Sequence, residues 1–213
     1  MKSPTSILPR LAHSQNRRDE ELNVALAKEL AAARDTAGIR EVVRNLWNVD
    51  AEVQSDCVKV LYEVGALEPG LIAGYAADFI KLLGSKNNRL VWGGATALAA
   101  IAQVSAAEVF ASWVTVRDAV ETGSVITADN GIKALALVAA TSPARRKAIF
   151  PYLLLHLGAC RPKDVPQRAE KIALAVNAGN RAAFVAALEK RMGDLSKAQA
   201  ARVKKVIKQV STL

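Results

Sequence analysis

Several side chains of this chain combine a flat aromatic ring, hydrogen-bonding groups and cations, a mixture that binding sites use to recognise a partner. Trp92 is an apolar anchor, Asp129 and Asn130 are directional hydrogen-bonding groups, and four cations accompany them. The seven candidates for a partner-binding groove are Arg89, Trp92, Asp129, Asn130, Lys133, Lys163 and Arg168. The alternative interpretation is that Trp92 turns inward as a core residue, and that the polar candidates are helix caps and surface charges.

The chain lacks the motifs of the common enzyme classes. It has no Gly-x-x-x-x-Gly-Lys-Ser/Thr phosphate loop, no Gly-x-Gly-x-x-Gly, no Gly-x-Ser-x-Gly and no His-Glu-x-x-His. We therefore predict a non-enzymatic protein without a cofactor. One catalytic alternative remains, because Asp129, Arg89 and Trp92 could serve base excision, in which an aromatic ring and a carboxylate flank an extruded nucleotide.

Two cysteines and two histidines are too few for a histidine-rich metal site. His156 and Cys160 have the i,i+4 spacing that places two soft ligands on one helical face, but structural zinc usually takes four ligands. Cys57 lies in a separate helical segment, which favours reduced, packed thiols over a disulfide. We predict no metal site.

Positive charge is concentrated at one end of the chain. The formal net charge is +9, and residues 141–213 alone carry +11. Lys197, Lys204 and Lys208 fall within about 40° of one another on a helical wheel and form one stripe. A basic end favours an acidic partner, such as a nucleic acid or an anionic protein surface, and the alternative is a solvated basic cap.

Residues of similar type recur every 37 positions, and this repeat must position the candidates. The columns are Leu46, Leu83, Val120 and Leu157; Leu61, Leu98, Leu135 and Ile172; Val64, Ile101, Val138 and Ala175; and the small residues Cys57, Gly94 and Gly131, which give way to Arg168. Positions one period apart lie side by side on adjacent units of a stacked array.

Each period contains two segments with helical spacing of apolar residues, separated by turn residues. The expected first helices are 38–47, 71–83, 106–120, 144–157 and 181–191, the second helices are 51–64, 88–104, 125–140, 165–177 and 197–210, and 19–34 forms an opening helix. Capping boxes are expected at Ser105 and Ser196, and Ser142 is expected to cap a helix that begins with Pro143.

Repeated helix pairs of this length, with Asp50-Ala-Glu-Val at a repeat junction, resemble the HEAT-like, armadillo-type repeat family over residues 36–211. The blocks 85–93 and 160–167 also look like those of uncharacterised bacterial members. The resemblance implies an all-α fold: a right-handed α-solenoid of about five HEAT-like helix pairs, with the second helices on its concave face. A branch of this family, the HEAT-like alkylpurine DNA glycosylases, uses Trp, Asp and Arg in a basic concavity. This chain shares those residue types, but its Trp and Asp positions do not align with the motif of that branch.

We expect residues 19–213 to form a single repeat array. Residues 1–18 contain Pro4, Pro9 and a polar stretch, which favours a disordered tail, with docking against the first helix as the alternative. No stretch is apolar enough for a membrane span or a signal peptide, so a cytoplasmic location is expected.

The leading functional hypothesis is a scaffold that binds a partner protein or peptide on its concave face. The alternative is a DNA-binding or alkylated-DNA-repair protein that uses the basic end, with Lys197, Lys204 and Lys208 as phosphate contacts.

Overall fold

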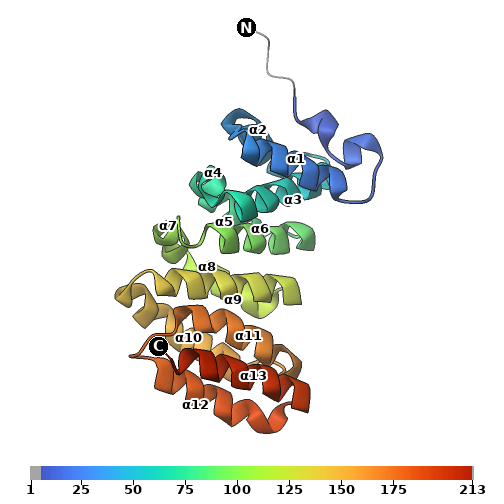
Figure 1. Cartoon of the computed structure of the whole chain (residues 1–213). Coiled ribbons are helices and arrows are strands. Elements are labelled where there is room, and N and C mark those ends of the chain that lie inside the picture. The colour runs from blue at the N-terminus through green and yellow to red at the C-terminus, as the bar shows by residue number, and fades with distance from the viewer. Residues whose placement is uncertain (1–5, 213) are drawn as a thin grey trace.

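The computed structural model describes residues 6–212, which form helices and the turns between them, without a β-strand (Figure 1). What we call the second-helix layer consists of α1 (Glu21–Ala32), α3 (Ala51–Leu67), α6 (Asn88–Ile101), α9 (Val125–Ala140), α11 (Val165–Ile172) and α13 (Lys197–Val210). What we call the first-helix layer consists of α2 (Thr36–Arg44), α4 (Pro69–Ile72), α5 (Ala76–Leu82), α7 (Ala106–Ala111), α8 (Trp113–Thr122), α10 (Pro143–Ala159) and α12 (Arg181–Arg191). None of the helices within 6–212 is long and apolar enough to span a membrane.

Each helix of the second-helix layer packs on the next along the chain, from α1 to α13 (Figure 1). Helices α2, α5, α8, α10 and α12 each pack against the second helix of their own pair. The columns that begin at Leu61 and Val64 are completely buried, with 0% exposure at Leu61, Leu98, Leu135, Ile172, Val64, Ile101, Val138 and Ala175. Because the apolar face of one pair is covered by its neighbours, the predicted all-α solenoid is confirmed.

Local start signals explain where some of the helices begin. Ser196 and Gln199 form the expected capping box on α13, and the Ser142 side chain accepts a hydrogen bond from the Arg145 N–H before Pro143. The capping box expected at Ser105 is wrong, because the Ser105 hydroxyl donates to the Ala73 carbonyl oxygen at 2.9 Å instead.

Two of the expected first helices are interrupted. The segment expected at 71–83 begins with the short α4 and a 3-10 turn, η4 (Ala73–Tyr75), before α5 starts. Gly70 and Gly74 lower the helix propensity there. The segment expected at 106–120 is divided into α7 and α8 at Ser112, whose backbone is not helical. Serine favours such breaks because its hydroxyl competes for backbone hydrogen bonds.

Residues 6–15, which we call the N-terminal arm, dock on α1 and α3. Docking on the opening helix was the alternative to a disordered tail over 1–18; residues 1–5 lie outside the described part. Leu11 and Ala12 are buried next to η1 (Leu8–Arg10) and η2 (His13–Gln15), which contact α1 and α3 respectively. The Ala12 N–H donates to Asn23 Oδ1 at 3.1 Å, and Asn23 Nδ2 donates to Asp56 Oδ1 at 2.7 Å. The His13 N–H donates to the other Asp56 oxygen at 2.8 Å. This buried polar network holds residues 6–15 in place, because Asn23 Oδ1 and Asp56 Oδ2 would otherwise lack a partner.

Replacing a glycine of the small-residue column is expected to affect stability differently from replacing a glycine outside it. A Cβ atom on Gly131 would lie 2.4 Å from Val120 Cγ2, whereas one on Gly158 would meet no atom within 4 Å. Gly131→Ala is expected to lower the free energy of unfolding by about 1–3 kcal/mol through overpacking. Gly158→Ala is expected to raise it by about 0.5–1 kcal/mol, because glycine is the poorer helix former. Urea denaturation measures both, and equal effects of the two substitutions would contradict a close contact between α8 and α9.

Candidate functional site

A groove of about 560 Å³ crosses the second-helix layer from α3 to a 3-10 turn that follows α11, η6 (Ala173–Ala175). We call this feature the groove. Its walls come from four successive repeats, and its lining residues are Tyr62, Glu63, Gly65, Ala66, Pro69, Thr96, Ala99, Ala100, Gln103, Asn130, Lys133, Leu137 and Leu174. A larger cavity of about 900 Å³ lies between the N-terminal arm and the starts of α3 and α6, and most of its lining side chains are charged.

A column with the 37-residue period runs across the groove. It contains Glu63, Ala100, Leu137 and Leu174, one from each of four successive units. Leu174 is 47% exposed although it is a large apolar residue. The side chain of Ala100 is small enough to keep the centre of the groove open. The column therefore supplies apolar surface in an open channel, which is the property of a binding site for side chains of a partner.

The amide of Asn130 is held in one orientation at the side of the groove. Asn130 Nδ2 donates to Thr96 Oγ1 at 3.0 Å and to the Ile126 carbonyl oxygen at 3.2 Å, and the Thr96 hydroxyl donates to the Trp92 carbonyl oxygen at 2.7 Å. Within residues 6–212, the Oδ1 atom of Asn130 accepts no hydrogen bond. An amide oxygen in this position can accept an N–H from a bound chain.

Two of the predicted groove residues, Asn130 and Lys133, line the groove, and Trp92 and Arg89 do not. Trp92 is half-buried, its ring centroid lies 5.8 Å from that of Tyr62, and the Arg89 guanidinium carbon lies 5.4 Å from the centroid of the indole. Arg89 also pairs with Glu20. Trp92 is therefore a packing residue at the edge of the core, held between a tyrosine and an arginine.

Asp129 and Arg168 are partners of each other. Arg168 Nη1 contacts Asp129 Oδ1, Lys171 Nζ lies 3.1 Å from the same oxygen, and Gln167 Nε2 donates to Oδ2. The side chain of Arg168 is only 3% exposed, so it is not accessible as a cation of a partner-binding groove. The reason is its position: residue 168 falls in the inward-facing column of Cys57, Gly94 and Gly131. Burial lowers the pKa of the Arg168 guanidinium to about 10.

The remaining predicted cations are exposed. Lys163 lies in the turn η5 (Pro162–Asp164), and Lys197, Lys204 and Lys208 lie on α13; none of the four forms an ion pair with another described residue. The nucleic-acid hypothesis that rests on the α13 lysines stays a prediction.

The constellation expected for base excision has other partners in the structure. Arg89 pairs with Glu20 on the α1 side, while Asp129 is engaged by Arg168 and Lys171 on the α11 side. Neither group is free to act on a nucleotide, so we do not propose this activity.

His156 is likewise occupied by a structural contact, and Cys160 is not part of a metal site among residues 6–212. His156 Nδ1 lies 3.1 Å from Glu121 Oε1, and the half-buried Cys160 is a free thiol, as is the buried Cys57. Glu121 also accepts a hydrogen bond from the Tyr152 hydroxyl at 2.6 Å. Tyr152 and His156 of α10 therefore both contact Glu121 of α8, which links the two helices.

No protein-family model matches the chain, and no curated protein matches it. Solved structures, in contrast, match the chain along most of its length. An engineered protein from the Northeast Structural Genomics Consortium matches with a TM-score of 0.66 and 20% identity over 97% of this chain and 98% of that chain. A designed armadillo repeat protein in complex with the peptide (KR)4 matches with a TM-score of 0.67 and 15% identity over 95% of this chain and 100% of that chain.

A natural protein has a similar architecture over part of its length. Kap121p bound to Pho4p matches with a TM-score of 0.63 and 13% identity, over 94% of this chain and 22% of that chain. Together with the designed armadillo repeat protein, this match shows that the chain has a HEAT/armadillo-like repeat fold. The resemblance inferred from the 37-residue period is confirmed.

Proposed function

We propose that this chain is a repeat scaffold that binds an extended peptide of a partner protein in the groove. The observation that supports this is the continuity of the groove across four successive units, α3, α6, α9 and η6. Packed helices lie about 8–10 Å apart, so four of them span roughly 24–30 Å. An extended chain covers about 3.3 Å per residue, and about eight residues therefore match the length of the groove.

The lining has the two kinds of contact that an extended peptide needs. The apolar column around Leu137 and Leu174 receives alternate side chains. The Oδ1 atom of Asn130 and the exposed amide of Gln103 are available to main-chain groups of the peptide, because neither forms a hydrogen bond that occupies it within the described residues. Main-chain contacts provide affinity, and the side-chain positions provide selectivity.

The similar structures support the proposal at the level of architecture. One of the designed armadillo repeat proteins holds the peptide (KR)4, and Kap121p holds Pho4p. A solenoid of this shape is therefore compatible with binding to another polypeptide.

Selection from a random peptide display library tests the proposal. Peptides enriched on the wild-type protein are expected to bind Ala100→Trp at least about tenfold more weakly, a loss of about 1.4 kcal/mol, because the indole fills the centre of the groove. The matched control is Ala183→Trp, which adds the same ring at an exposed position of α12, outside the groove. Thermal unfolding of both variants verifies that they are folded.

The proposal is wrong if no peptide is enriched on the wild-type protein. It is also wrong if the enriched peptides bind Ala100→Trp and Ala183→Trp equally well, because they would then contact another surface.

A further inference from the structure

The charges beside the α3 and α6 end of the groove are balanced. Lys59 Nζ lies 3.0 Å from Glu20 Oε2 and 2.7 Å from Glu63 Oε1, and Arg89 pairs with the other oxygen of Glu20. The two carboxylates of Glu20 and Glu63 thus pair with the two cations Lys59 and Arg89. Burial raises the pKa of Glu20, but the hydrogen bonds from Lys59 and Arg89 outweigh burial and hold it below its ordinary value. Among residues 6–212, Glu63 is the one carboxylate that lines the groove, and it is already bound to Lys59.

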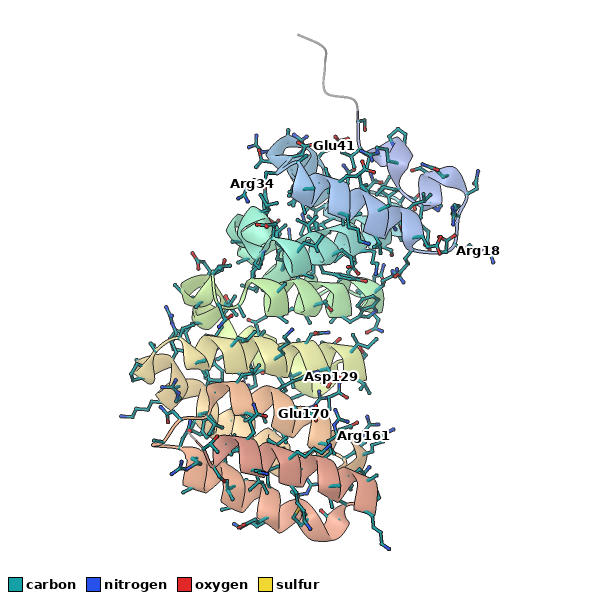
Figure 2. All side chains as sticks on the ribbon, viewed as in Figure 1. Arg18, Arg34, Glu41, Asp129, Arg161 and Glu170 are labelled. Atoms are coloured by element: carbon teal, nitrogen blue, oxygen red, sulfur yellow. The ribbon has the colours of Figure 1, made fainter. Side chains whose placement is uncertain are left out.

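Beside the other end of the groove, the charges of α9, α11 and α13 are not balanced. The single carboxylate of Asp129 is shared by Arg168 and Lys171. Glu170, the other acid on this side, is occupied by Arg202, whose Nε and Nη2 atoms lie 2.5 and 2.6 Å from its two oxygens. Figure 2 shows Asp129 and Glu170 on the neighbouring helices α9 and α11.

Lys133 adds to this excess of positive charge. It lies on α9, it lines the groove, it is exposed, and it forms no ion pair with any residue in 6–212. With Arg168, Lys171 and Arg202 it makes four cations against the two carboxylates. This cluster, which we call the cationic end of the groove, borders the groove through Lys133 and carries two uncompensated positive charges.

The cations of this cluster act on one another. Burial lowers the pKa of the Lys171 ammonium group to about 8, and the positive charges of Arg168 and Lys133 contribute to the same shift. Such repulsion is relieved when an anion is brought near. The side chain of Lys171 is 18% exposed and that of Lys133 is exposed, so each ammonium group is accessible to a carboxylate from solvent.

Resting on the proposed function, we propose that the groove selects an acidic peptide, whose carboxylates lie against Lys133 and Lys171 while its apolar side chains lie on Leu137 and Leu174. The argument is charge complementarity between the uncompensated cations and the occupant. A basic peptide does not fit this pattern, because Glu63 is already neutralised and Lys133 repels further cations.

Three fluorescein-labelled peptides of twelve residues test the inference directly. Leucine alternates with glutamate in the first peptide, with glutamine in the second and with lysine in the third. Fluorescence polarisation titrations with the wild-type protein are expected to show the glutamate peptide binding at least about tenfold more tightly than the glutamine peptide, and the lysine peptide binding most weakly. Higher salt should reduce the difference between the glutamate and glutamine peptides, because exposed charges are screened.

Two charge reversals of equal size locate the effect. Lys133→Glu is expected to weaken the glutamate peptide about tenfold and to leave the glutamine peptide nearly unchanged. Lys190→Glu is the matched control, because Lys190 is an exposed residue of α12 that lines a different depression, in the first-helix layer. It should change the binding of neither peptide by more than about twofold. Both residues lack an ion-pair partner among the described residues, so neither reversal breaks an internal contact.

The acid selectivity is overturned if the glutamine or lysine peptide binds as tightly as the glutamate peptide, or if Lys133→Glu and Lys190→Glu have equal effects. It is also overturned if none of the three peptides binds. The display selection with Ala100→Trp tests the proposed function separately. If the selected peptides are neutral or basic and Ala100→Trp weakens their binding, the groove is a peptide site without acid selectivity.

Discussion

Replacing Asp129 by alanine is expected to lower the free energy of unfolding by about 3–5 kcal/mol. The side chain of Arg168 is 3% exposed and that of Lys171 is 18% exposed, so neither cation can recover a full water shell when its carboxylate is removed. The cost is that of leaving charge buried and unpaired, which exceeds the cost of losing the attraction alone. Urea denaturation followed by circular dichroism measures the change.

Two further variants show whether the unpaired charge is the cause. Arg168→Leu in the Asp129→Ala background is expected to restore part of the lost stability, because it removes the buried guanidinium. Asp118→Ala is the control, since Asp118 pairs with Arg117 in an ion pair whose side chains are 60% and 38% exposed. Such a pair contributes about 0–1 kcal/mol. A loss at Asp129 no larger than the loss at Asp118 would contradict the buried pair.

Arg191→Ala is expected to lower the free energy of unfolding by about 2–4 kcal/mol, because the guanidinium satisfies several carbonyl groups at the end of α10. Its Nη1 donates to the carbonyl oxygens of Leu157 and Gly158 at 2.7 and 3.0 Å, and its Nη2 donates to that of Cys160 at 2.8 Å. Arg191 is 8% exposed, so water cannot easily replace these three bonds. Urea denaturation again provides the measurement.

The planar shape of the guanidinium is the feature under test. Arg191→Lys is expected to restore only part of the stability, because one ammonium group cannot reproduce the fork that reaches all three oxygens. Lys190→Ala, at the neighbouring exposed position, should change the free energy by less than about 0.5 kcal/mol. Full stability of Arg191→Lys would show that charge near the end of α10 is sufficient.

Much of the architecture could be predicted from local patterns. The 37-residue period placed the buried columns correctly, and the helix over 125–140 formed although Val125, Ile126 and Thr127 favour strands. The apolar spacing of a whole helix outweighed three local preferences. Ser196 acted as an N-cap because all of its partners lie within one turn, whereas the hydroxyl of Ser105 found the Ala73 carbonyl on another segment.

The site could be predicted only in part. Asn130 and Lys133, two of the seven candidates, line the groove. So does a column that was not among the candidates, Ala100, Leu137 and Leu174, which has the same 37-residue spacing. That column could have been found by extending the search for repeats to every helical position. Arg168 is buried because its position falls in the inward-facing column of Cys57, Gly94 and Gly131, which outweighs the usual preference of a charged residue for solvent.

The sequence by itself determined the repeat, the order of the helices and the residues of the core, because these depend on the spacing of apolar side chains along one chain. The tertiary structure alone decided which columns of the second-helix layer are exposed to solvent, and which charged side chains have no ion-pair partner. These properties depend on the rotation of each helix against its neighbours, which is set by contacts such as Gly131 with Val120. They also depend on ion pairs between residues that are far apart in the chain, such as Asp129 with Arg168. Spacing along one helix specifies neither of them.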